Sequence, residues 1–204
     1  MNAEIADRVQ QLFAEVTEAL ARATYALLNA DRSLGQAVVD DDRRIDECVA
    51  TVEHALWEEL HALSDRAKDL HQLVGMLLVL PELERSADLA EHIAQRAVYG
   101  LGGEMTPVSR GIVQRMSEVA VEMWRAAADA YAGAESHALE LHETDEELDI
   151  LHDRLSAEVS GGAMPPAIGA QVTLLARFYE RIGDHAVNLS RRVASLEAED
   201  GHAP

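Results

Sequence analysis

The residues of this chain that could do chemistry are carboxylates spaced four positions apart. Four such pairs are Asp42/Asp46, Glu84/Asp88, Asp145/Asp149 and Glu180/Asp184. In a helix, residues four apart lie on one face, so each pair presents two carboxylates side by side. Their mutual repulsion costs only about a few tenths of a kcal/mol, and 37 acidic residues in 204 give roughly six or seven such pairs by chance. A single pair is therefore weak evidence of a site.

The same two pairs recur in the same order in both halves of the chain. Moving Glu84-Arg85-x-x-Asp88 forward by 96 positions superposes it on Glu180-Arg181-x-x-Asp184. The upstream pair recurs as well, as Asp42/Asp46 in the first half and Asp145/Asp149 in the second. The chain is therefore a duplication in which each half carries one acidic site.

Each half could bring its two pairs together across a groove between helices. At 100° per residue, Glu180 and Asp184 lie about 160° from the apolar residue Ile182, so they are expected to point away from the core. Four carboxylates at one point require cations, and an all-oxygen set suits Fe, Mn, Mg or Ca, with Zn as a further candidate. Two other interpretations stay open, namely a solvated acidic face and neutralisation by Arg85 and Arg181.

The nine histidines give a weaker signal. Glu58-x-x-His61 resembles one element of a di-iron bundle, but such a site needs two of these elements and two further glutamates. Most of the histidines are therefore expected at the surface or at the boundary of the core. His92, His185 and Asn188 directly follow the repeated motif, so they are the better candidates to orient its carboxylates.

The elements that must position these residues are helices, because helical periodicity covers nearly the whole chain. The longest apolar stripe is Ile168, Val172, Leu175, Tyr179, Ile182, Ala186, Leu189, Val193 and Leu196. We predict an all-α fold of two tandem three-helix bundles related by an internal pseudo-two-fold axis, over residues 1–101 and 104–196. Residues 197–204 lack apolar periodicity and are expected to be a frayed tail.

Glycine, threonine and proline mark the helix boundaries. Gly100-Leu101-Gly102-Gly103 separates the two halves, and Thr106 with Pro107 predicts a capped helix start. Pro81 removes the hydrogen bond to the Leu77 carbonyl, so a bend or an interruption is expected one turn before Glu84.

Composition narrows the class of protein. A formal net charge of −20 repels phosphate backbones, so nucleic-acid binding is not expected, whereas cations and basic partner surfaces are favoured. The one cysteine, Cys48, offers no disulfide, and the N-terminal residues lack the pattern of a signal peptide. The apolar run from Leu73 to Leu80 is too short to span a bilayer. We therefore expect a cytoplasmic protein.

The segment from Glu180 to Leu189, with the sequence Glu-Arg-Ile-Gly-Asp-His-Ala-Val-Asn-Leu, resembles the signature of the PhoU family of phosphate-signalling regulators. Its first copy, Glu84 to Ile93, is similar but has Ser86-Ala87 and His92 where the family has Ile-Gly and Asn. The resemblance extends over both halves. The second copy is therefore expected to be the stronger cation site.

The resemblance implies a cytosolic regulator rather than an enzyme. Its expected partners are a sensor histidine kinase and the ATPase subunit of a phosphate ABC transporter, so contact with the membrane is expected only through partners, and a homodimer is compatible with it. The resemblance also implies metal sites at Asp42, Asp46, Glu84 and Asp88 in one half and at Asp145, Asp149, Glu180 and Asp184 in the other. The alternatives are a metal-free acidic helical adaptor and a di-iron or ferritin-like carboxylate protein.

Overall fold

The structure is a computed structural model that describes residues 3–62, 67–133 and 138–200. The described helices are α1 Ala3–Leu28, α2 Arg32–Ala62, α3 Ala67–Val98, α4 Leu101–Glu104, α5 Pro107–Tyr131, α6 Ala138–Ser160 and α7 Pro166–Asp200. No strand occurs in these ranges, so the predicted all-α class is confirmed. The short helix α4, at the glycine-rich junction, was not predicted.

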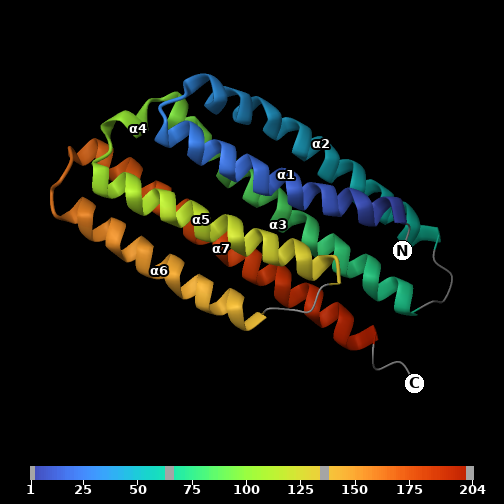
Figure 1. The fold of residues 1–204 in the computed structure, drawn as a ribbon. Coiled ribbons are helices and arrows are strands. Elements are labelled where there is room, and N and C mark those ends of the chain that lie inside the picture. The colour runs from blue at the N-terminus through green and yellow to red at the C-terminus, as the bar shows by residue number, and fades with distance from the viewer. Residues whose placement is uncertain (1–2, 63–66, 134–137, 201–204) are drawn as a thin grey trace.

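The helices form two three-helix bundles that lie side by side (Figure 1). In the first bundle α1, α2 and α3 pack on one another, and in the second α5, α6 and α7 do so. The two bundles join through contacts of α1 with α5 and of α3 with α7. The predicted pair of bundles with pseudo-two-fold symmetry is therefore confirmed, with α2 and α6 on the outer flanks.

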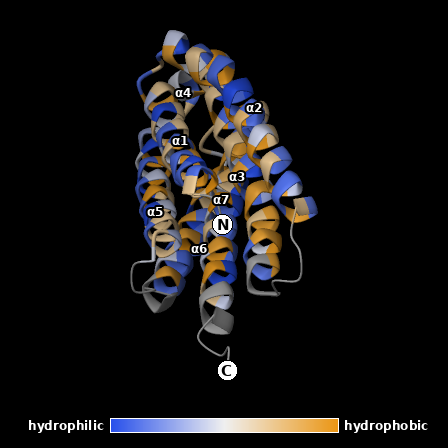
Figure 2. Ribbon diagram, turned by 90° about the vertical axis from the view of Figure 1, so that its right-hand side faces the viewer, coloured by the Kyte–Doolittle hydropathy of each residue, from blue (hydrophilic) through white to orange (hydrophobic). Residues whose placement is uncertain are grey.

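The core sits where the apolar stripes of these helices meet. Its largest fully buried side chains include Trp124, Tyr179 and Phe13, and the Trp124 indole N–H donates to the Ile182 carbonyl at 3.0 Å. Figure 2 shows hydrophobic and hydrophilic residues alternating around the helices, as amphipathic helices require. None of the helices in the described ranges combines the length and the apolarity that a bilayer crossing requires.

The junction between the halves is held by close backbone contacts. A Cβ placed on Gly102 would come within 1.8 Å of the Leu27 carbonyl oxygen, so α4 can rest on the end of α1 only with glycine there. The Arg110 guanidinium donates to the carbonyls of Leu28 and Gly102 and thereby satisfies acceptors left open at the helix ends. Thr106 caps α5, as expected, by accepting from the Ser109 N–H at 3.0 Å.

Two helices differ from the sequence-based expectations, α3 in its continuity and α7 in its end. Helix α3 is not interrupted at Pro81 but runs continuously from Ala67 to Val98. The buried side chains of Val79, Leu80 and Leu83 pack in the core on both sides of the proline, and this packing offsets the loss of one hydrogen bond. Helix α7 continues to Asp200, beyond residue 196, and residues 201–204 of the expected tail lie outside the described ranges.

Candidate cation sites

The first-half site lies between α2 and α3. Asp42 and Asp46 on α2 face Asp88 on α3, and one carboxylate oxygen of each lies within 4.8 Å of the others. Among the described residues, this is the only group of three acidic, histidine or cysteine side chains that approach so closely. Spacing by four residues places the two α2 carboxylates on one face, and the packing of α2 on α3 supplies the third.

Burial and like charge raise the pKa of the two α2 carboxylates of this group, Asp42 and Asp46. The pKa of Asp42 rises from 3.8 to about 7, mainly because burial removes water and also because Asp46 and Asp88 are negative. The pKa of Asp46 and that of Glu84 also rise, in each case first through burial and then through acidic neighbours that include Asp88. A bound cation would relieve this repulsion, so the all-oxygen donor set fits a hard metal ion.

Glu84 is placed beside this group rather than within it. Its carboxylate is close enough to Asp46 and Asp88 to have its pKa raised by them, but it is not one of the three that share a point. Glu91, one turn beyond Asp88, raises the pKa of Asp42 and lines a hollow of about 440 Å³ with Asp42 and Asp46. Sequence reasoning missed Glu91, although its spacing of three from Asp88 was a signal that could have found it.

The second-half site is arranged differently. Asp145, Asp149 and Asp184 are near enough for Asp149 to raise the pKa of both others, after burial, which is the largest cause. Glu180, however, pairs with Arg177 and also lies 3.7 Å from the His152 Nε2. Sequence reasoning proposed Arg181 as the neutralising residue, whereas the structure assigns this contact to Arg177, one turn earlier on the same helix.

The orientation expected for the second motif agrees with the structure. Asp184 is exposed and Glu180 is partly exposed, whereas Ile182 between them is buried. In the first half, Arg85 lies 3.9 Å from Glu82, a buried glutamate that sequence reasoning did not single out. In the first motif Glu84 is exposed as well, whereas Ser86, at the position of Ile182, is buried.

Two histidines near the motifs make contacts between the two halves. His185 shares a 2.8 Å hydrogen bond with the Ser86 hydroxyl and lies 3.7 Å from Glu82. Burial lowers the pKa of His185, and Arg181 and Arg85 lower it further against the opposing effect of Glu82. His92 stacks on the Phe178 ring at 5.4 Å between centroids. His92 Nε2 also lies 3.9 Å from Glu91, so the expectation that these histidines orient carboxylates stays a prediction beside their contacts between α3 and α7.

Two contacts between α3 and α7 occupy equivalent positions in the internal repeat but differ in their chemistry. Glu82 lies 3.8 Å from Arg192, and at the equivalent place Arg96 lies 4.7 Å above the centre of the Phe178 ring. An ion pair on one side of the axis thus corresponds to a cation–π contact on the other. Both contacts hold α3 against α7, the two helices that carry the repeated motifs.

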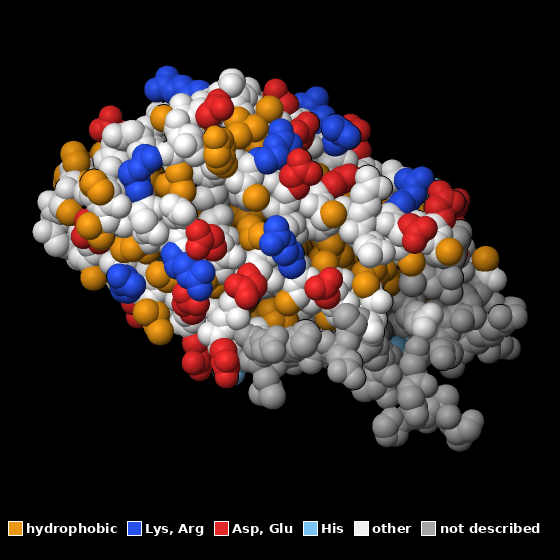
Figure 3. All heavy atoms as spheres, in the orientation of Figure 1, with side chains coloured by type: hydrophobic (Ala, Val, Ile, Leu, Met, Phe, Trp, Pro, Cys, Tyr) orange, Lys and Arg blue, Asp and Glu red, His pale blue; other side chains and the backbone are white. Residues whose placement is uncertain are grey.

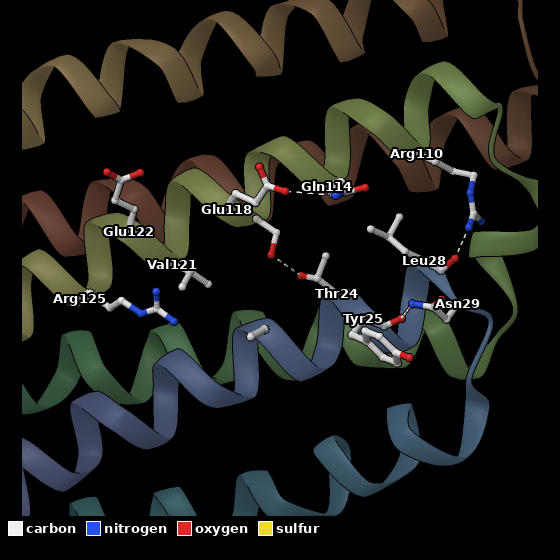
Figure 4. A pocket seen from close by; sticks show the side chains of 12 residues that line it. Thr24, Tyr25, Leu28, Asn29, Arg110, Gln114, Glu118, Val121, Glu122 and Arg125 are labelled. Carbon is white, nitrogen blue, oxygen red and sulfur yellow. Dashed lines mark hydrogen bonds between the residues drawn. The ribbon is translucent and has the colours of Figure 1, made fainter.

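A separate groove of about 870 Å³ runs between α1 and α5. Figure 4 shows Thr24 and Tyr25 of α1 facing Gln114, Glu118 and Val121 of α5 across it. At its base Ser117 donates to the Thr24 hydroxyl at 2.9 Å, and Thr24 shares a 2.6 Å hydrogen bond with the buried Tyr179 hydroxyl. This groove was not predicted from the sequence.

On the face drawn in Figure 3, basic and acidic side chains are interspersed.

Comparison with known proteins gives consistent matches over the chain. The family model described as "PhoU domain" matches twice, at residues 9–97 and 113–193. A curated protein of Mycobacterium tuberculosis named "Phosphate-specific transport system accessory protein PhoU homolog 2" is 31% identical over 93% of this chain and 91% of its own length. The Mycobacterium leprae protein named PhoU homolog 1 is 30% identical over 93% of this chain and 87% of its own.

Solved structures show the same fold. The crystal structure of PhoU from Pseudomonas aeruginosa covers 97% of both chains with a TM-score of 0.88 and 23% identity. The phosphate transport system regulatory protein PhoU from Streptococcus pneumoniae covers 97% of this chain and 95% of its own, with a TM-score of 0.85 and 21% identity. At these identities the likeness concerns the fold alone.

Proposed function

Because this chain belongs to the PhoU family, we propose that it is a cytosolic regulator of phosphate uptake and phosphate-starvation signalling. In this role it acts through the ATPase subunit of a phosphate ABC transporter and damps a sensor histidine kinase when phosphate is ample. The observation that carries the proposal is the match of the PhoU domain model to both halves. Curated relatives over nine-tenths of the chain, named for a phosphate-specific transport system, support it.

We further propose that the group of Asp42, Asp46 and Asp88 holds a metal cation. The support is the approach of their oxygens within 4.8 Å and the raised pKa of Asp42, both of which a cation would turn into favourable contacts. Carboxylate ligands suit hard ions such as Mg, Mn, Ca or Fe, and Zn accepts them as well. Glu84 and Glu91 would add negative charge around the ion.

The contacts around the two motifs favour the opposite order of the two sites to the one expected from the sequence. The more regular second motif was expected to bind the cation more strongly, but its Glu180 already contacts Arg177 and His152. A cation there would compete with positive charge supplied by the chain itself. The first-half group has the closer carboxylates, and Arg85, the arginine of its motif, lies 3.9 Å from Glu82. We therefore propose that the first half holds the stronger site.

The regulatory proposal is tested by deleting the gene. Loss of a damping signal is expected to leave phosphate-starvation genes expressed even in ample phosphate, as a reporter fusion would measure. The gene for the parent protein, supplied on a plasmid, is expected to restore repression. Normal repression in the deletion strain would overturn the proposed regulation.

Metal binding and the burial of carboxylates distinguish the proposed regulator from two alternatives. A metal-free acidic adaptor requires that tag-free protein contain no bound metal and that divalent ions leave its thermal stability unchanged. A di-iron or ferritin-like protein needs several carboxylates inside the bundle, whereas Glu82 is the only buried carboxylate in the described ranges. That observation favours a regulator with surface cation sites over the di-iron alternative.

A further inference from the structure

An apolar surface is exposed where α2 ends and α3 begins. Four large apolar side chains there are 42–49% exposed: Trp57, Leu70, Val74 and Leu78. We call them the α2/α3 apolar patch. They are four of the nine exposed large hydrophobic residues in the described ranges, and the other five come from α1, α5, α6, α7 and the residue after α3, Tyr99. Such a cluster on a soluble protein marks an interaction surface.

The patch is continuous along one face. Leu70, Val74 and Leu78 follow one another at intervals of four residues, so they form one stripe on α3. Trp57 is level with this stripe. Trp57 lies 15 residues beyond Asp42 on α2, a rise of about 22 Å along the helix axis. Val74 lies 14 residues before Asp88 on the antiparallel α3, a rise of about 21 Å. Figure 2 shows the start of α3 as a largely hydrophobic stretch.

The internal repeat shows that the fold does not need this patch. In the second half, the positions equivalent to Trp57, Leu70 and Val74 are Ser160, Pro166 and Ala170. Only Leu78 has an apolar counterpart of its own size, Leu174, which is 43% exposed. Because the second bundle folds with these smaller residues, packing does not explain the larger ones in the first. Their role is specific to the first half.

An acidic surface adjoins the patch. Glu53 lies on α2 between Trp57 and Asp46, and its charge raises the pKa of Glu84 on the neighbouring helix α3. The equivalent of Glu53 in the second half is Ser156, so this charge is also particular to the first half. A second copy of this chain is a poor occupant, because each copy has a formal net charge of −20 and would bring acidic residues against acidic residues.

We propose that the α2/α3 apolar patch docks an amphipathic helical segment of a partner protein, with lysine or arginine residues at the end of that segment that reaches Glu53 and Glu84. The distance from Leu70 to Glu84 along α3, about 21 Å, corresponds to about four turns of such a helix. Its apolar face covers Trp57, Val74 and Leu78. The proposal goes beyond the regulatory function because it defines the chemistry of the partner surface, whichever protein carries it.

The test measures binding of a synthetic peptide to the full-length protein. The probe is a fluorescent 18-residue helical peptide with leucine on one face and lysine at one end, and its counterpart carries glutamate in place of lysine. At about 0.15 M salt, where long-range attraction is screened, the lysine peptide is expected to bind and the glutamate peptide is not. Equal binding of both peptides would overturn the charge complementarity.

Variants that copy the second half give the decisive comparison. Trp57→Ser/Val74→Ala is expected to weaken lysine-peptide binding about tenfold or more, because apolar contact area is lost. Leu78→Gln is expected to weaken it as well, whereas the matched variant Leu174→Gln is expected to leave it unchanged. Circular dichroism and melting temperature verify that each variant is folded. Unchanged binding in the patch variants, or equal loss in Leu174→Gln, would overturn the proposal.

Two further measurements distinguish this docking surface from a dimer interface and from the cation group. Analytical ultracentrifugation of the parent protein is expected to show no dimer that the patch variants abolish, and such a dimer would overturn the proposal in favour of a second copy. In Asp42→Asn/Asp88→Asn, the patch substitutions are expected to weaken peptide binding by the same factor as in the parent. This result would hold even if the cation site were wrong, so the two proposals fail independently.

Discussion

Asp42 is the carboxylate whose pKa rises to about 7, because burial and the neighbouring negative charges act in the same direction. Its pKa of about 7 means that the cation-free protein takes up a proton there near neutral pH. The folded pKa lies above the ordinary 3.8, so protonation favours the folded state at low pH. This contribution to stability is lost as the pH rises towards 7. A cation must displace the proton, which ties metal binding to pH.

Cation affinity is therefore predicted to rise with pH up to about 7 and then to level off. Below that value each unit of pH is expected to reduce the affinity up to about tenfold, because one proton competes for Asp42. Calorimetric titration with Mn²⁺ at pH 6, 7 and 8 measures this dependence. An affinity that does not change between pH 6 and 8 would contradict the raised pKa.

The same residue gives a prediction for the cation-free protein. Asp42→Asn removes the half-buried charge, so in the presence of a chelator at pH 8 it is expected to stabilise the fold by roughly 1 kcal/mol after allowance for solvent screening. At pH 4 the gain is expected to vanish, because the parent carboxyl is then protonated. Urea unfolding at both pH values tests this, and a pH-independent effect would contradict it.

At the scale of helices, α4 depends on the absence of one side chain. In Gly102→Ala the added Cβ would meet the Leu27 carbonyl oxygen at 1.8 Å, and this backbone atom has little room to move. We expect a loss of about 2 kcal/mol or more in the free energy of unfolding. Gly103→Ala is the matched control, because nothing lies within 4 Å of its Cβ.

Urea denaturation of the two α4 variants provides the measurement. The control Gly103→Ala is expected to stay within about 1 kcal/mol of the parent, since alanine also has the higher helix propensity. Equal stability of both variants would show that the contact between α4 and α1 is not required. It would also weaken the view that Gly102 fixes how the two halves meet.

For the whole molecule, cation binding is expected to stabilise the fold asymmetrically. A cation at a hundredfold excess over its dissociation constant stabilises the folded state by about 2.7 kcal/mol. Asp42→Asn/Asp88→Asn is predicted to abolish most of the cation-dependent rise in melting temperature, and Asp145→Asn/Asp184→Asn to remove less. Differential scanning fluorimetry with and without Mn²⁺ compares them.

Equal losses in the two double variants would contradict the asymmetry between the halves. Absence of any cation-dependent shift in the parent would contradict the site itself. The proposed asymmetry belongs to the assembled molecule, because it rests on Arg177 and His152 contacting Glu180 in one half while Arg85 lies near Glu82 in the other.

The sequence by itself determined the helices, the duplication and the outward orientation of the repeated carboxylates. These features are local, because a period of 3.6 residues relates each carboxylate to the apolar stripe of its own helix. The cap at Thr106 is local as well, and so is the placement of two carboxylates on one helix face by a spacing of four residues. The motif of the second half was sufficient to indicate the family that the comparisons then showed.

Only the tertiary structure decided which carboxylates meet at one point. Asp88 joins Asp42 and Asp46 while Glu84 stays beside them, because the rotation and register of α3 against α2 select the residue that faces the groove. The same packing brought His152 to Glu180 and left Leu78 at the surface. These features depend on segments far apart in the chain. The helical period within one segment does not specify how that helix is rotated against another.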